Sequence, residues 1–129
     1  MIHQVRVIFG DTDQMGVVYY ANYLRWFEGA RAALLRERGL SGRHLVELGV
    51  AFPVAEAYCK YRRPAHYEDL LDVDIQVTEL GHARIRFGYQ VRRAGELVAD
   101  GYTVHACVDG RGRPVRIPEP LRAAFAGAG

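Results

Sequence analysis

Two aspartates occupy the part of the chain where residue types and spacing best fit chemistry. Asp11 and Asp13, separated by Thr12, follow an apolar strand-like stretch and precede a long helical pattern that starts at Asn22. The start of a helix gathers unpaired backbone N–H groups and partial positive charge. A carboxylate held opposite such N–H groups can act as a base or nucleophile facing an oxyanion site. The acidic turn is therefore predicted to carry the chemistry of this protein.

Less specific interpretations of the two aspartates remain open at this point. Asp13 could be an ordinary turn or helix-cap residue, which is common for aspartate. Asp11 is interpreted as structural, its side chain hydrogen-bonding local backbone. A metal site is the rival interpretation of an Asp-x-Asp pair, but no histidine or carboxylate cluster has suitable spacing. No metal is predicted.

The composition predicts one soluble domain over residues 1–129. Half of the residues are hydrophobic, which is enough for a core, and the formal net charge of +2 gives no argument for nucleic-acid binding. No apolar run is long enough to span a bilayer, and the strand-like N-terminus does not resemble a secretory signal. Cys59 and Cys107 have neither metal-ligand spacing nor a disulfide framework, so we expect a cytoplasmic protein with reduced thiols.

Hydrophobic periodicity gives the elements that must position the acidic turn. Residues 22–38 have apolar side chains at helical spacing and end at Gly39. Residues 70–80 and 83–93 alternate between apolar and polar side chains, as strands do. Further elements are predicted at residues 2–10 (strand, with Phe9 on its apolar face), 41–48 (short helix), 50–62 and 96–109 (strands) and 118–125 (short helix).

Three consecutive strands joined by tight turns imply an antiparallel meander. One long apolar helix together with five strands makes the fold class α+β. The strands after residue 70 are long enough to curl around the helix. We therefore expect a long central helix wrapped by a curved five-stranded antiparallel sheet.

The sequence resembles the 4-hydroxybenzoyl-CoA thioesterase family and the related short-chain acyl-CoA thioesterases, which have the hotdog fold. The resemblance is carried by the segments Asp11-Thr12-Asp13, Gly16-Val17-Val18-Tyr19, Asn22-Tyr23 and Trp26-Phe27-Glu28. It implies hydrolysis of an acyl-CoA thioester without a metal or redox cofactor. It also implies a homo-oligomer, a dimer or tetramer, with active sites at subunit boundaries.

The resemblance implies roles for particular residues. Asp13 matches the catalytic carboxylate of the family, as general base or nucleophile, and the backbone N–H of Tyr20 matches the group that polarises the thioester carbonyl. The residues predicted to contact substrate near the turn are Gly16, Val17, Tyr19, Asn22 and Tyr23. Tyrosines at a helix start can equally be core residues, and Asn22 is also interpreted as the N-cap or first-turn residue of the helix.

Arginines are the natural partners of the CoA phosphates, and Arg62, Arg63 and Arg84 are the candidates. The sequence leaves two other functions open. A non-catalytic hotdog protein would bind acyl-CoA or an acyl carrier protein without turnover. A hotdog dehydratase would need a catalytic histidine, and none lies in the acidic turn.

Overall fold

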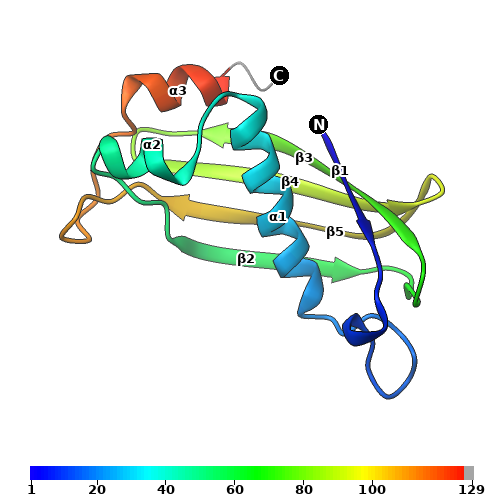
Figure 1. Cartoon of the computed structure of the whole chain (residues 1–129). Coiled ribbons are helices and arrows are strands. Elements are labelled where there is room, and N and C mark those ends of the chain that lie inside the picture. Colours follow the sequence, from blue (N-terminus) through cyan, green and yellow to red (C-terminus); the bar gives the residue numbers. More distant parts are fainter. Residues whose placement is uncertain (127–129) are drawn as a thin grey trace.

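The protein is a long helix packed across one face of a five-stranded antiparallel sheet (Figure 1). The computed structural model describes residues 1–126, and the last three residues of the predicted domain lie outside that range. The strands are β1 (Ile2–Arg6), β2 (Val54–Tyr61), β3 (Leu70–Leu80), β4 (Arg84–Arg93) and β5 (Glu96–Ala106). The helices are α1 (Asn22–Glu37), α2 (Gly42–Glu47) and α3 (Glu119–Ala126), with a 3-10 turn at Phe9–Asp11.

The strand order is β1-β3-β4-β5-β2, with every neighbouring pair antiparallel. The predicted meander is therefore the centre of the sheet, and β1 and β2 pair onto its two sides. The turn between β4 and β5 is Ala94-Gly95, both with positive φ, as a tight hairpin turn requires. The α+β class and the five-stranded antiparallel sheet are confirmed.

The core lies between α1 and the meander. The helix buries its apolar stripe, which includes Trp26, Ala30 and Leu34, against alternate residues of β3 and β4. At its centre the rings of Phe27 and Tyr89 stack, with centroids 4.1 Å apart and planes 4° from parallel. The helical spacing and the strand alternation seen in the sequence therefore correspond to one shared interface.

Several predicted element ends were wrong. The first strand ends at Arg6 rather than residue 10, because the chain turns into the 3-10 helix, and Phe9 is 76% exposed rather than buried. β2 begins only at Val54, after Pro53, which has no N–H to donate to a ladder. β5 ends at Ala106, and the chain beyond it forms only isolated bridges such as Val108↔Pro114.

β2 and β5 approach each other very closely at Gly101. A Cβ built on this glycine would overlap the carbonyl oxygen of Tyr58 and stand 3.0 Å from Cα of Cys59. Only a residue without a side chain fits there, so Gly101 sets the pairing of the edge strand.

A chain of polar groups crosses the core beneath α1. The Tyr89 hydroxyl lies 2.7 Å from Thr103 Oγ1, which lies 2.9 Å from His105 Nε2, and His105 Nδ1 lies 3.0 Å from the carbonyl oxygen of Phe52. That carbonyl can only accept, so Nδ1 of a neutral imidazole carries the proton and Nε2 accepts from Thr103. His105 is fully buried, and both of its ring nitrogens have partners, so it is a residue of the interior.

Stability is expected to fall as the pH is lowered from 8 to 5 because of His105. Burial lowers its pKa below the ordinary 6.5, and the nearby Arg31 guanidinium lowers it further, against the opposing hydrogen bond to Phe52. His105 therefore binds a proton more tightly in the unfolded chain than in the folded chain. The stability that this group contributes above pH 6.5 is lost as the pH falls below 6.5. Urea midpoints across this range measure the slope. His105→Gln should flatten the slope, and an unchanged slope in that variant would contradict the assignment.

Candidate active site

Asp11 braces the acidic turn against the start of α1. Its side chain is buried, with Oδ2 accepting the N–H of Ile8 at 3.0 Å and Oδ1 accepting from Arg25 Nη2 at 2.6 Å. Its carbonyl oxygen accepts the N–H of Tyr19 and the side-chain amide of Asn22, each at 2.8 Å. One residue thus ties the strand end, the turn and the helix together, as expected for a structural aspartate.

Asn22 is the first residue of α1, which is one of the two positions predicted for it, the N-cap and the first turn. The N-cap position is held by Ala21, which makes no side-chain cap bond. The Asn22 amide instead reaches back to the carbonyl of Asp11. Its contribution is to fix the turn relative to the helix axis.

Asp13 closes a tight loop over residues 13–17. Its N–H donates to Val17 O at 2.8 Å, and its carbonyl accepts from Gly16 N–H at 3.0 Å. Gly16 has φ +80°, a left-handed backbone conformation that glycine adopts readily. Oδ1 of Asp13 accepts the N–H of Met15 at 2.8 Å, and within residues 1–126 the second carboxylate oxygen has no hydrogen-bond donor. The carboxylate is held at one oxygen and available at the other.

Asp13 lines a hollow of about 350 Å³ where the turn, the start of α1 and the end of β2 meet. We call it the Asp13 hollow. Its lining residues are Asp13, Met15, Val17, Val18, Tyr20, Tyr23, Tyr61, Arg62, Arg63 and Pro64. A carboxylate, a cluster of phenol rings and two guanidinium groups therefore border one cavity.

Tyr20 immediately precedes the helix cap, and its backbone is oriented by its neighbours. The N–H groups of Tyr19 and Asn22 are used, whereas those of Tyr20 and Ala21 have no acceptor among residues 1–126. The Tyr20 carbonyl accepts from the Tyr61 hydroxyl at 3.1 Å. An unpaired N–H beside a helix start is suited to binding a negatively charged oxygen.

Two phenols of the Asp13 hollow, those of Tyr23 and Tyr61, stay protonated at neutral pH. Burial raises the pKa of Tyr23 to about 12, and burial followed by the neighbouring Cys59 raises that of Tyr61 to about 12. Their rings pack edge to face with centroids 5.4 Å apart. They supply an apolar wall and hydrogen-bond donors rather than charge.

Residues 7–125 match the sequence family described as the thioesterase-like superfamily. An acyl-CoA thioesterase of Haemophilus influenzae is 38% identical over 123 residues, which cover 94% of this chain and 90% of that protein. The chain belongs to the thioesterase-like superfamily. It is a thioester hydrolase, as the family resemblance implied.

Solved structures of other thioesterase-like proteins have the same fold. A hypothetical protein from Thermus thermophilus superposes with a TM-score of 0.93 at 35% identity, covering 99% of this chain and 98% of that one. A 1,4-dihydroxy-2-naphthoyl-CoA thioesterase from Synechocystis superposes with a TM-score of 0.90 at 27% identity, covering 97% and 94%. The predicted hotdog fold is confirmed.

The fold brings only part of the predicted site of this thioesterase-like chain together. The predicted residues that line the Asp13 hollow are Asp13, Val17, Tyr20, Tyr23, Arg62 and Arg63. Gly16, Tyr19 and Asn22 belong to the same turn but do not line it. Arg84 lies at the start of β4, in another hollow bordered by Glu79 and Val104.

Four residues of the hollow were not predicted as site residues: Met15, Val18, Tyr61 and Pro64. Tyr61 is the last residue of β2 and directly precedes the two predicted arginines. Its position next to Arg62 could therefore have indicated that it lines the hollow. Met15 borders the hollow from the loop that Asp13 closes and is 81% exposed. Nothing in its local pattern indicated that position.

The two arginines of the Asp13 hollow are engaged in exposed ion pairs. Arg62 lies 3.0 Å from Asp100, and Arg63 lies 3.6 Å from Glu96, with arginine side chains 41% and 61% exposed. Exposed pairs of this kind contribute about 0–1 kcal/mol. Both guanidinium groups can therefore exchange these partners for a phosphate at little cost.

Residues 1–126 contain no group of three or more histidine, cysteine or carboxylate side chains able to hold a metal ion. Over the same residues, no helix has the length and hydropathy needed to traverse a lipid bilayer.

Asp11→Asn is expected to weaken both the fold and catalysis. An amide loses the charge that binds Arg25 and can satisfy Ile8 or Arg25 but not both, which costs about 1–3 kcal/mol. Turnover should fall because the turn carrying Asp13 loosens, and a displacement of about 1 Å can cost 100-fold. Urea denaturation and thioester turnover measure the two effects. Wild-type values for both would show that Asp11 is not a brace.

Proposed function

We propose that this thioester hydrolase acts on acyl-CoA, releasing a free carboxylic acid and CoA. Asp13 is the general base or nucleophile, and the backbone N–H of Tyr20 is the oxyanion donor. The observation that carries the proposal is that these two groups border one hollow, with a carboxylate oxygen and an N–H both without partners among residues 1–126. The acyl-CoA thioesterase from Haemophilus influenzae supports the choice of substrate class.

The chemistry needs few groups because a thioester carbonyl is electrophilic and a thiolate leaves easily. In one route, Asp13 attacks the carbonyl carbon, the C–S bond breaks to release the CoA thiolate, and water opens the resulting mixed anhydride. In the other, Asp13 takes a proton from water as that water attacks. In both, negative charge grows on the carbonyl oxygen, where one hydrogen-bond donor is worth about 3–4 kcal/mol in other enzymes.

Arg62 and Arg63 are assigned to the phosphates of CoA. They border the same hollow as Asp13, and their ion pairs with Asp100 and Glu96 are exposed. Guanidinium groups bind phosphate through paired hydrogen bonds. The tyrosine-rich wall formed by Tyr20, Tyr23 and Tyr61 is assigned to the acyl side of the substrate.

The active form is proposed to be a homo-oligomer, as the family resemblance implies. β2 is an edge strand, and seven of its eight residues are exposed. An exposed edge of this length is a template for pairing with a second copy. Antiparallel pairing of two β2 strands would place the start of one opposite the end of the other. Arg84, which lies near the start of β2, would then approach the partner's Asp13 hollow.

Sedimentation velocity tests the assembly, with a dimer or larger species expected and a monomer at working concentration contradicting it. Thiol release from a panel of short, long and aromatic acyl-CoAs tests the activity. Hydrolysis of at least one class is expected. Binding of acyl-CoA without turnover across the whole panel would instead support a non-catalytic binder.

A further inference from the structure

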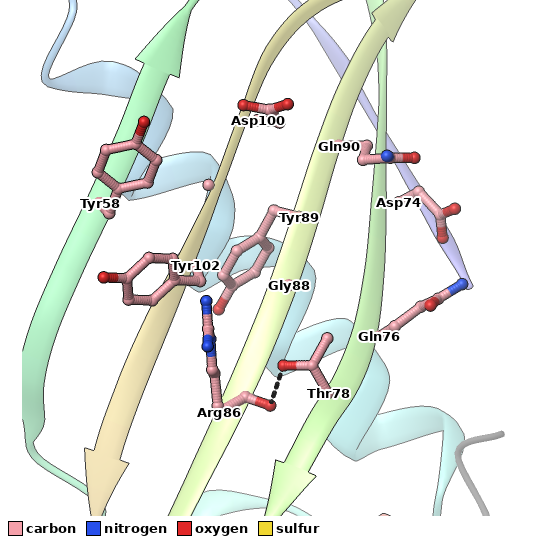
Figure 2. A pocket seen from close by; sticks show the side chains of 11 residues that line it. Tyr58, Asp74, Gln76, Thr78, Arg86, Gly88, Tyr89, Gln90, Asp100 and Tyr102 are labelled. Carbon is pink, nitrogen blue, oxygen red and sulfur yellow. Dashed lines mark hydrogen bonds between the residues drawn. The ribbon is translucent and has the colours of Figure 1, made fainter.

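A second hollow of about 500 Å³ lies on the opposite face of the sheet, over Gly88 of β4 (Figure 2). We call it the outer hollow. Gly88 is paired with Gln76 on β3 and with Tyr102 on β5, while its chain neighbours Phe87 and Tyr89 are buried toward α1. Gly88 carries no side chain, and the Thr78 methyl group lies over it, since a Cβ built on Gly88 would stand 2.9 Å from Thr78 Cγ2. The outer hollow and the Asp13 hollow have no lining residue in common.

One wall of the outer hollow is aromatic, with the Asp100 carboxylate toward one end and the Arg86 guanidinium toward the other. The rings of Tyr58 and Tyr102 stack with centroids 5.4 Å apart, and the Arg86 guanidinium carbon lies 4.0 Å from the Tyr102 ring centre. Nη1 of Arg86 lies 3.3 Å from the exposed carboxylate of Glu79. Its Nε is buried and has no hydrogen-bond acceptor in the described part of the chain. The guanidinium is therefore held flat with unused donor capacity, which suits an anion.

The facing wall carries carboxamides and a carboxylate. Figure 2 shows Gln76, Gln90 and Asp74 gathered across the floor from Tyr102 and Arg86. Gln90 Oε1 accepts from Arg92, while its amide NH₂ and the whole Gln76 amide make no hydrogen bond within residues 1–126. Glutamine amides pair in bidentate fashion with the edge of a purine base.

We propose that the outer hollow binds a purine nucleotide. The base lies in the hollow with its hydrogen-bonding edge toward Gln76 and Gln90, and the phosphate contacts Arg86. A hollow of about 500 Å³ is of the size that takes small ligands. The wall with Gln76 and Gln90 suits a base, and Arg86 on the other wall suits a phosphate. The ligand could be a free nucleotide or the nucleotide half of CoA. The first source is independent of thioester hydrolysis, and the second rests on the proposed acyl-CoA substrate.

Calorimetric titration of the full chain with AMP and with adenosine 3′,5′-bisphosphate tests this directly. Saturable binding is expected, weakened at least tenfold by Gln76→Ala and by Arg86→Met. Arg116→Met is the matched control, because this arginine is 59% exposed and lies outside the outer hollow. Asp13→Asn should also bind nucleotide normally, which separates this proposal from the fate of the proposed hydrolysis.

Tighter binding of the bisphosphate than of AMP would identify the nucleotide half of CoA as the ligand. Equal binding of the two probes would identify a free nucleotide as the ligand. Absence of saturable binding by either probe at millimolar concentration overturns the proposal. So does binding that survives both Gln76→Ala and Arg86→Met, since the nucleotide would then lie elsewhere. Circular dichroism checks folding, and if Arg86→Met does not fold, Gln76→Ala decides.

Discussion

Asp13→Asn should lower thioester turnover at least about 100-fold while the fold is retained, since a positioned acid or base contributes about 10²–10⁴-fold. The asparagine carbonyl can still accept the Met15 N–H, so the loop over residues 13–17 has no reason to open. An amide oxygen, however, neither attacks a thioester nor takes a proton from water. Thiol release from acyl-CoA measures the loss, and urea denaturation measures the fold.

Asp109→Asn is the matched control for that experiment. Asp109 also accepts backbone N–H groups in a turn, from Arg111 at 2.8 Å and Arg113 at 3.0 Å, but it does not line the Asp13 hollow. Its variant should hydrolyse substrate at the wild-type rate. Undiminished hydrolysis by Asp13→Asn would remove Asp13 from the mechanism.

Gly101→Ala should destabilise the protein by about 1–3 kcal/mol or more, the cost of forcing extra volume into a packed site. The added methyl group would overlap the carbonyl of Tyr58, and backbone cannot move aside as a flexible side chain can. β2 would have to shift, and with it Tyr61 at its end and Arg62 beyond. Turnover should therefore fall together with stability.

Gly110→Ala provides the comparison, because nothing lies within 4 Å of a Cβ built there and its φ is not in the left-handed region. Its urea midpoint should match that of the wild type. If Gly101→Ala also unfolded at the wild-type midpoint, the close approach of β2 and β5 would not constrain the edge strand.

Periodic patterns predicted the elements well where a single face is buried. The strand at residues 70–80 was predicted with its observed bounds, because alternate side chains face α1 and solvent along its length. The helix ends one residue before the prediction, and Gly39, at φ +75°, stops it as expected. The edge strand β2 was harder to predict. It is exposed along most of its length, so its sequence has little alternation between apolar and polar side chains.

The candidate site was predictable where residues are neighbours in sequence. Asp13 and Tyr20, which the family resemblance named, both line the Asp13 hollow. Arg84 was grouped with Arg62 by charge alone, but the two lie near opposite ends of β2, which only the strand register reveals. The brace formed by Arg25 and Asp11 was likewise invisible, because it depends on how the turn folds back over the helix start.

The strand order also has a consequence for how the chain is made. β1 and β2 are synthesised before the strands they pair with, since β1 pairs with β3 and β2 with β5. The apolar face of α1 likewise has no sheet to cover until the meander exists. The first half of the chain must therefore leave the ribosome and wait, with its hydrophobic helix uncovered, until residue 106 has emerged. The Asp13 turn is translated early, yet the hollow that it borders is completed only when β2 has docked on the last strand.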